Sequence, residues 1–379
     1  MKKLCFVTTV SLTVRAFLVP ILAHLRSNTD WELTVICDDD ATLAADLPEG
    51  VRYIPVSMKR GISPAGIGAM LKMRKIFKTE KFDYVQYSTP NAALYAAMAS
   101  KMAGIKHRRY HLMGFRFLGF SGWKRSLFKA IEKFTCKLSA DIECVSPSNM
   151  KLGVAEKVFP ADKARVLFYG SSAGVDLDKF DIEKKAAWRQ ELRREYGYEE
   201  RDCVFGFAGR ITGDKGINEL IDAFRGMENP NARLFLAGRI EDEHTLNEQA
   251  MEWAKEQKTV RFCGFVPDLE RYYAMMDVLV LPSYREGFGN IIIEAQAMGL
   301  PVIVTDIPGP IDAMEPDVTG LTVPVKDAAA LRSAMEELCA HREIREEMGR
   351  KGRAFVEERF DQKKLAQVIL EDRKKRLCE

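Results

Sequence analysis

One stretch constrains the fold of this chain more than any other: YREGFGNIIIEAQAMG at residues 284–299. It follows the apolar run 278–281, which is typical of a buried strand, and a second apolar run comes directly after it. Gly287 and Gly289 lack a Cβ, so the backbone can pass close to a ligand there. From Asn290 the pattern becomes helical, and we expect Asn290 to be the N-cap. The stretch therefore predicts a strand, a glycine turn, a helix and a strand, as in phosphate-binding βαβ units.

The charges at this turn indicate what it binds. A helix N-terminus attracts anions, yet Glu286 and Glu294 lie on either side of it and would repel a phosphate. Sugar hydroxyls are the natural partners of these carboxylates. A second glycine loop supplies the opposite charge, because Arg210 and Lys215 follow the apolar strand at 204–208. Two basic side chains at a strand-to-helix turn are suited to a diphosphate.

Short apolar runs alternate with helical patterns, such as 67–78 and 92–102, along the chain. This alternation predicts the α/β class with doubly wound parallel sheets. No G-x-G-x-x-G follows the first strand, which argues against a dinucleotide-binding domain. The predicted strands are 4–10, 32–37, 51–56, 84–87, 109–112, 142–145 and 165–168 in the first half, then 204–208, 234–237, 260–264, 278–281 and 301–305.

Glu286 and Glu294, with seven residues between them, resemble the E-x7-E motif of glycosyltransferase family 4. The loop Gly209-Arg210 to Lys215-Gly216 resembles the same family's G-R-x4-K-G motif. The resemblance covers nearly the whole chain, strongly in 204–325 and loosely before it. It implies the GT-B fold, with two Rossmann-like domains facing across a cleft. The implied domains are residues 1–170 for the acceptor, residues 171–360 for the nucleotide sugar, and a helix at 361–379 that crosses back to the first domain.

The resemblance also implies a retaining, metal-independent hexosyl- or N-acetylhexosaminyl-transferase. Arg210 and Lys215 would hold the donor diphosphate and do the work of a metal, so neither a metal nor another cofactor is expected. Glu286 would bind the donor sugar and Glu294 the ribose. A UDP-sugar is the expected donor, although GDP stays open. Further donor-binding candidates are Gly209, Arg239, Phe265, Val266, Phe288, Gly289, Asn290 and Ile291.

In the first half, Ser88, Asn91 and Thr13 follow predicted strands and are candidates for the acceptor side, because ligands bind at the carboxyl ends of parallel strands. His111 resembles the family's catalytic histidine, but it stands two residues earlier than the usual His-Gly. A spacing of two keeps it on the same strand face, and a structural histidine is the alternative. The acidic run 38–40 could bind a divalent metal, but a solvated turn is the favoured interpretation.

Charge is uneven along the chain. Residues 1–165 hold 26 basic and 14 acidic side chains, whereas the remainder holds 31 and 40. Within the basic half, 121–140 forms an amphipathic helical pattern in which Trp123, Leu127, Ile131, Phe134 and Leu138 alternate with basic residues. Lys124, Arg125, Lys129 and Lys133, with Trp123, are expected to contact an anionic membrane. The alternative is that the apolar stripe packs on the domain's own sheet while the lysines face water.

These features predict a cytoplasmic enzyme that binds peripherally at the inner face of the cell membrane. The eight scattered cysteines are typical of reduced thiols, no apolar run approaches the roughly 20 residues of a membrane span, and no nucleic-acid motif is present. By resemblance to bacterial capsule, O-antigen and exopolysaccharide enzymes, the expected acceptor is a polyprenyl-diphosphate-linked saccharide. Two alternatives are a sugar-nucleotide epimerase on the same fold and a non-catalytic nucleotide-binding protein.

Overall fold

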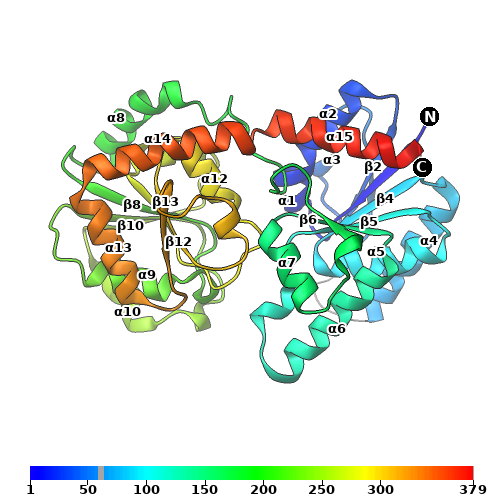
Figure 1. Cartoon of the computed structure of the whole chain (residues 1–379), viewed down its shortest axis with the longest axis horizontal. Helices are drawn as coiled ribbons and strands as arrows, with labels where there is room; N and C mark the ends of the chain where they lie inside the picture. The colour runs from blue at the N-terminus through cyan, green and yellow to red at the C-terminus, as the bar shows by residue number, and fades with distance from the viewer. Residues whose placement is uncertain (59–63, 379) are drawn as a thin grey trace. The chain divides into compact units, whose positions relative to one another are not determined.

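The structure is a computed structural model that describes residues 1–58 and 64–378. The chain forms two compact units (Figure 1). Unit 1 comprises Met1–Ala173 and Gln362–Glu379, and unit 2 comprises Gly174–Asp361. Each unit is built on one parallel sheet with helices on its faces, as the sequence predicts.

The sheet of unit 1 has seven parallel strands in the order β3-β2-β1-β4-β5-β6-β7. Consecutive strands are joined largely by helices, because a parallel strand needs a long crossover connection. The strands are β1 Lys3–Val7, β2 Glu32–Cys37, β3 Arg52–Pro55, β4 Tyr84–Ser88, β5 His107–Leu112, β6 Asp141–Cys144 and β7 Ala164–Arg165. The helices are α1 Ser11–Thr13, η1 Val14–Leu18, α2 Val19–Asn28, α3 Leu43–Asp46, α4 Pro64–Glu80, α5 Pro90–Met102, η2 Arg116–Gly119, α6 Gly122–Leu138, α7 Pro147–Ala155, η3 Ala161–Lys163 and α15 Gln362–Cys378.

Two predicted strands of this unit run three residues past their observed ends. The first ends at Val7 and not at residue 10, because the Thr9 amide donates to Thr89 Oγ1 at 3.1 Å and the chain turns there. The last is β7, which ends at Arg165, whereas the predicted strand ran to residue 168. Phe168 has a φ of +53°, and this left-handed conformation is incompatible with an extended strand.

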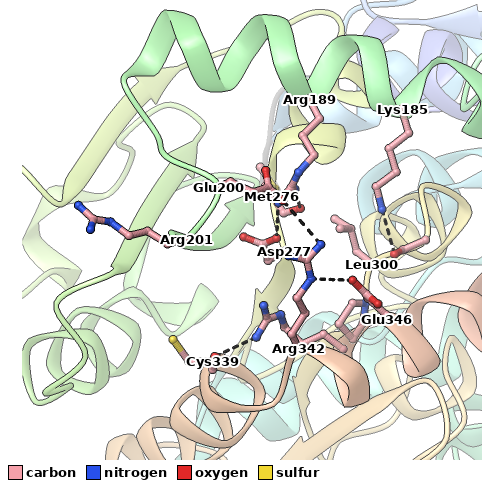
Figure 2. A pocket seen from close by; sticks show the side chains of 13 residues that line it. Lys185, Arg189, Glu200, Arg201, Met276, Asp277, Leu300, Cys339, Arg342 and Glu346 are labelled. Carbon is pink, nitrogen blue, oxygen red and sulfur yellow. Dashed lines mark hydrogen bonds and ion pairs between the residues drawn. The ribbon is translucent and has the colours of Figure 1, made fainter.

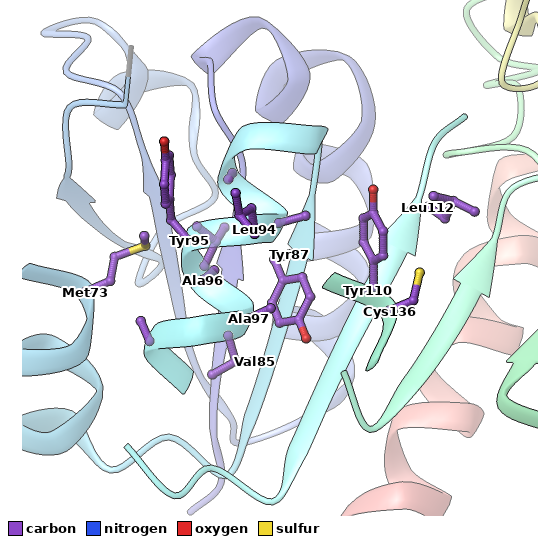
Figure 3. Packing of buried hydrophobic residues seen from close by; sticks show 14 of the residues in the cluster. Met73, Val85, Tyr87, Leu94, Tyr95, Ala96, Ala97, Tyr110, Leu112 and Cys136 are labelled. Atoms are coloured by element: carbon purple, nitrogen blue, oxygen red, sulfur yellow. The ribbon is translucent and has the colours of Figure 1, made fainter. Parts of the chain in front are cut away.

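The alternation of side chains along β1 divides the core of unit 1 into two clusters. Cys5 and Val7 point to one face and Leu4 and Phe6 to the other. Figure 3 shows the first cluster, in which Tyr87 and Tyr110 of neighbouring strands meet helices α4, α5 and α6. The second cluster packs against α2 and α15.

A buried ionic cluster binds α15 to the sheet of unit 1. Arg109 of β5 lies with Asp141 and Glu143 of β6 and with Asp372 of α15, at 2.5–2.7 Å. Arg373 of α15 donates to Glu143 at 2.8 Å and to Gln86, and Arg376 pairs with Asp141. Three guanidinium groups thus face three carboxylates, so the cluster is close to neutral and tolerates burial.

The surroundings of Glu143 show how strong this cluster is. Burial by itself would raise the pKa of Glu143, but Arg373 and Arg109 more than offset burial and hold that pKa at about 2. The charged carboxylate is therefore the form that the folded protein favours, and it holds segments more than 200 residues apart in the chain.

The sheet of unit 2 has six parallel strands in the order β10-β9-β8-β11-β12-β13. They are β8 Cys203–Ala208, β9 Ala232–Ala237, β10 Val260–Gly264, β11 Val278–Leu281, β12 Val302–Thr305 and β13 Gly320–Val323. The helices are η4 Ile182–Lys184, α8 Lys185–Tyr196, η5 Gly213–Lys215, α9 Ile217–Arg225, η6 Glu243–Thr245, α10 Glu248–Glu256, α11 Leu269–Met275, α12 Asn290–Ala297, η7 Pro310–Asp312, α13 Ala328–Ala340 and α14 Arg342–Arg359.

We predict that Glu143→Gln destabilises the protein by about 3–5 kcal/mol at pH 7, because it leaves buried guanidinium charge uncompensated. The folded-state pKa of Glu143 lies below its usual 4.5, so its stabilisation is present above pH 4.5 and is lost as the pH falls towards 2. The difference between wild type and variant in urea denaturation should shrink over this range. Arg165→Gln, which removes an exposed partner of Asp372, should cost less than about 1 kcal/mol. A pH-independent difference would contradict the assignment.

Candidate active site

Two loops that lie far apart in the sequence meet at the carboxyl edge of the second sheet. One follows β8 and runs from Gly209 to Gly216, and the other follows β11 and runs from Pro282 to Gly289. They lie side by side because β8 and β11 are neighbouring parallel strands. Lys215 of the first loop forms an ion pair with Glu286 of the second, and both side chains are largely buried.

Further contacts tie these two loops together. The Tyr284 amide donates to the Asp214 carbonyl at 2.9 Å, and the Arg285 guanidinium pairs with the Asp214 carboxylate at 2.9 Å. Tyr284 Oη also donates to Glu219 of α9 at 2.6 Å. Gly216 has a φ of +72°, and a Cβ there would lie 2.0 Å from the Pro282 carbonyl oxygen, so only glycine fits.

The first loop also pairs with the segment that follows β9. The Gly209 amide donates to the Ala237 carbonyl, and the Ile211 amide donates to the Arg239 carbonyl, each at 2.9 Å. Gly238 and Gly209 approach so closely that a Cβ on Gly238 would lie 1.7 Å from the Gly209 carbonyl oxygen. The two glycines therefore allow the loop of Arg210 to lie directly against the loop of Arg239.

Arg210 and Arg239 both lie at the surface of this edge. The Arg210 guanidinium is 3.5 Å from the carboxylate of Glu241, and both side chains are about half exposed. The Arg239 guanidinium lies over the ring of Phe265, 5.6 Å from its centroid. Phe265 is 65% exposed, whereas its neighbour Val266 is half-buried.

Helix α12 begins at Asn290, but its N-cap is Gly289 and not Asn290. Gly289 has a φ of +91°, a left-handed conformation that glycine adopts readily, so it takes the cap position. Asn290 and Ile291 are the first two residues of the helix, where amides lack partners within the helix. The Phe288 side chain is buried against Phe360, with ring centroids 5.3 Å apart, so this residue anchors the turn.

Glu294 lies in the second turn of α12, where Tyr273 of α11 donates to its carboxylate at 3.4 Å. Burial raises the pKa of Glu294 to about 7. Lys179 and the Tyr273 hydroxyl favour the charged form and oppose burial, while Glu270 adds to the increase. Glu294 thus carries a proton more readily than an ordinary glutamate, and hydrogen-bond donors from a ligand would favour its ionised form.

The candidates from the first half of the chain lie in unit 1. His111 is buried near the end of β5, with Nδ1 3.2 Å from Ser88 Oγ and Nε2 3.9 Å from Glu143. Burial lowers the pKa of His111, Glu143 opposes this effect, and Arg373 and Arg109 reinforce it. The neutral imidazole is therefore the form that the folded protein favours.

The other candidates of unit 1 also lie beyond the carboxyl ends of strands. Asn91, in the first turn of α5, accepts from Arg116 at 3.2 Å, and Thr13 is a half-buried residue of α1. In the acidic run 38–40, Asp40 pairs with Arg15 at 2.7 Å and accepts from the Thr42 amide at 2.9 Å. Arg15 holds the pKa of Asp40 well below its usual range.

Helix α6 exposes much of its apolar stripe. Trp123 is 71% exposed, and Leu127 and Phe134 are each 45% exposed. Only part of the stripe packs on the domain, since Ile131 and Leu138 are half-buried against the core. The basic residues also differ among themselves: Lys124 and Lys133 are exposed, whereas Arg125 and Lys129 both bind Glu156 of unit 1.

Sequence reasoning did not identify several residues that shape the site. Asp214, Tyr284 and Arg285 hold the two loops together, and Glu241 and Tyr273 contact Arg210 and Glu294. Asp214 lies inside the G-R-x4-K-G loop and Tyr284 opens the second stretch, so their positions were a usable signal. Nothing local in the sequence singles out Glu241 or Tyr273.

Comparison with known proteins shows the same two-part organisation. Residues 3–146 match the family model described as glycosyl transferase 4-like, and residues 189–355 match the model of glycosyl transferases group 1. The capsular polysaccharide biosynthesis glycosyltransferase CapM of Staphylococcus aureus is 31% identical over 90% of this chain and 88% of its own length. An Escherichia coli UDP-Gal:α-D-GlcNAc-diphosphoundecaprenol α-1,3-galactosyltransferase is 24% identical over 82% of this chain and 81% of its own.

The chain therefore belongs to glycosyltransferase family 4 and is a glycosyltransferase of GT-B fold. Among solved structures, HepE of Anabaena in complex with UDP-glucose superposes with a TM-score of 0.80 at 18% identity, over 99% of this chain and 100% of its own. Within the described parts of the chain, no helix is long and apolar enough to cross a membrane.

We predict that Glu294 reduces the stability of the folded protein as the pH rises. Its folded-state pKa lies above the usual 4.5, so its favourable contribution is full below pH 4.5 and is lost as the pH rises through about 7. Relative to Glu294→Gln, the wild type should lose about 3 kcal/mol of unfolding free energy between pH 4.5 and 8. Urea titrations across this range would measure the difference, with Glu252→Gln on the exposed face of α10 as control. Parallel curves for wild type and Glu294→Gln would refute the prediction.

Proposed function

We propose that this protein is a retaining glycosyltransferase that moves a hexosyl or N-acetylhexosaminyl unit from a UDP-sugar to a hydroxyl of a polyprenyl-diphosphate-linked saccharide. The observation that carries the proposal is the convergence of Arg210, Lys215 and Glu286 on neighbouring parallel strand ends. Relatives support the acceptor class, because the Escherichia coli enzyme and a Campylobacter jejuni N-acetylgalactosaminyltransferase are both named for undecaprenyl-diphosphate saccharides. HepE has been crystallised with UDP and UDP-glucose, which supports the donor.

The site residues divide the donor among them. Arg210 and Lys215 hold the diphosphate and stabilise the charge that develops as it leaves. Glu286 accepts from hydroxyls of the donor sugar, and its pairing with Lys215 fixes its position. Glu294 accepts from the ribose hydroxyls. The amides of Gly289 to Ile291 add hydrogen-bond donors at the start of α12, Gly209 belongs to the loop that holds the diphosphate, and Arg239, Phe265 and Val266 surround the base.

The reaction needs no nucleophile from the protein. The acceptor hydroxyl attacks the anomeric carbon from the face that the diphosphate leaves, and the departing phosphate oxygen takes the hydroxyl proton. The new glycosidic bond therefore keeps the anomeric configuration of the donor. Two cationic side chains offset the charge of the leaving group, so the proposed mechanism requires no metal ion.

Unit 1 supplies the acceptor side of the proposed enzyme. Thr13 and Asn91 lie beyond strand ends and Ser88 is the last residue of β4. These three residues bind the acceptor saccharide, and His111 contributes near the reacting hydroxyl. The exposed face of α6, formed by Trp123, Lys124, Leu127, Lys133 and Phe134, contacts the cytoplasmic surface of the membrane that holds the lipid acceptor. Its apolar side chains enter the interface, and its lysines face anionic headgroups. Arg125 and Lys129 lie at its margin and are paired with Glu156.

We expect Arg210→Ala and Glu286→Gln each to reduce sugar transfer about 100-fold or more, because each removes a group that acts on the reacting end of the donor. The measurement is transfer from a panel of UDP-sugars to undecaprenyl-diphosphate-linked saccharides, with the anomeric configuration of the product read by NMR. Lys258→Gln, an exposed lysine of the same unit, should leave transfer unchanged.

The same assay separates the alternatives. Conversion of the UDP-sugar without an acceptor would indicate an epimerase. UDP binding without turnover on any acceptor would indicate a nucleotide-binding protein. An inverted product would contradict the retaining mechanism, and unchanged turnover in Glu286→Gln would contradict the proposed donor site.

For the membrane face, we expect the triple variant Trp123→Ser, Leu127→Ser, Phe134→Ser to reduce binding to phosphatidylglycerol-containing vesicles at least tenfold, because it removes the inserted apolar area. Comparison with flotation on neutral vesicles would measure how much of the binding depends on anionic headgroups. The double variant Ile67→Ser, Leu71→Ser, which removes two exposed apolar side chains of α4, is the matched control and should change binding little. Equal binding by wild type and triple variant would refute the proposal.

A further inference from the structure

Unit 2 contains a cavity that takes no part in the proposed reaction. It has a volume of about 390 Å³ and lies at the amino ends of β8, β11 and β12, the sheet edge opposite to Arg210 and Glu286 (Figure 2). Helices α8, α13 and α14 and the turn at Gly299–Pro301 complete its wall. A neighbouring cavity of about 380 Å³ shares Lys185, Gly299 and Glu346 with it.

The lining of this cavity is unusually cationic. Five basic side chains and three acidic ones line it. The acidic groups are already engaged: Asp277 pairs with both Arg189 and Arg193, at 2.8 and 2.5 Å. Glu346 and Glu200 both lie near Arg342, at 2.8 and 3.7 Å.

Two of the cations have no carboxylate partner. Lys185 donates to the Gly299 carbonyl at 3.1 Å, and Arg345 donates to the carbonyls of Leu338 and Cys339. Among the described residues, no carboxylate oxygen lies within 4.0 Å of either cationic group. Carbonyl oxygens carry only partial charge, so two positive charges in one cavity wall stay largely uncompensated.

The surroundings of Lys185 are consistent with this shortage of negative charge in the cavity wall. Burial, together with the like charges of Arg189 and Arg193, lowers the pKa of Lys185 to about 8, against the opposing effect of Asp277 and Glu346. An anion in the cavity would offset the free-energy cost of burying these positive charges. Figure 2 shows Lys185, Arg189 and Arg342 around the cavity, so a bound anion can meet cations from more than one helix.

We propose that this cavity binds a phosphate dianion, free or as the terminal group of a small phosphomonoester, through Lys185 and Arg345. Two uncompensated cations match the two charges of the ligand, and each contact would be a charge-assisted hydrogen bond. The site differs from the donor site, because the two sets of residues lie at opposite ends of the strands of one sheet.

Isothermal titration with inorganic phosphate, at constant ionic strength set by NaCl, tests the proposal. The double variant Lys185→Gln, Arg345→Gln should weaken phosphate binding tenfold or more, where each tenfold corresponds to about 1.4 kcal/mol. The matched control is Lys184→Gln, Arg332→Gln, which removes two neighbouring cations outside the cavity and should bind as wild type does. A parallel titration with glucose 1-phosphate distinguishes the sources: tighter binding assigns the site to an organic phosphate, and equal or weaker binding to free phosphate.

The donor site provides the competing explanation, so Arg210→Ala is titrated as well. Phosphate binding that survives Lys185→Gln, Arg345→Gln and disappears in Arg210→Ala would overturn the proposal, as would no saturable binding by wild type.

A measurement on the wild-type protein excludes misfolding of a variant as the explanation. Cys339 lines the cavity and Cys378 is exposed elsewhere. Phosphate should slow alkylation of Cys339 and leave Cys378 unaffected, and equal rates with and without phosphate would refute the site.

Discussion

The ion pair between Lys215 and Glu286 depends on the direction of the strands in the second sheet. Parallel strands end at the same edge, so loops that follow β8 and β11 lie side by side although about 70 residues separate these two side chains. The contacts of Asp214 with Tyr284 and Arg285 then fix the two loops against each other. Glycine at 216 is a consequence of this closeness, because a side chain would collide with the Pro282 carbonyl.

The first unit is held by a different principle. Its terminal helix returns to the sheet through buried guanidinium and carboxylate groups in equal number, so charge balance and not only apolar packing fixes its place. Such a cluster is costly to break by single substitutions and specifies one docking position for α15. It also borders His111, where burial lowers the pKa of the imidazole, Glu143 opposes this effect, and Arg373 and Arg109 reinforce it.

Each strand of the second sheet thus connects two chemically different edges. The carboxyl edge presents glycine loops, a helix N-terminus and paired charges. The amino edge presents a cavity whose cations are only partly balanced. Both edges are suited to phosphate groups, but by different means: backbone amides and loop cations at one edge, and cationic side chains of surrounding helices at the other.

The sequence by itself determined the alternation of strands and helices, with β13 as the strand that it missed, and it predicted the two loops that meet at the carboxyl edge of the second sheet. Apolar periodicity, glycine position and motif spacing are local properties, and local backbone preferences follow from them. Strand ends were less certain, as the shorter β1 and β7 show, because a single side-chain contact or a positive φ at Phe168 ends a strand.

Tertiary structure alone decided which charges are neutralised and which apolar side chains stay exposed. Arg125 and Lys129 pair with Glu156, and α15 returns to Arg109, whatever their distance along the chain. Trp123 and Phe134 stay exposed in the same packed domain. The amphipathic pattern of α6 showed that the helix has two faces, but only the packed domain shows which face is covered. The physical reason is that burial and ion pairing depend on neighbours in space, which no local pattern of residues records.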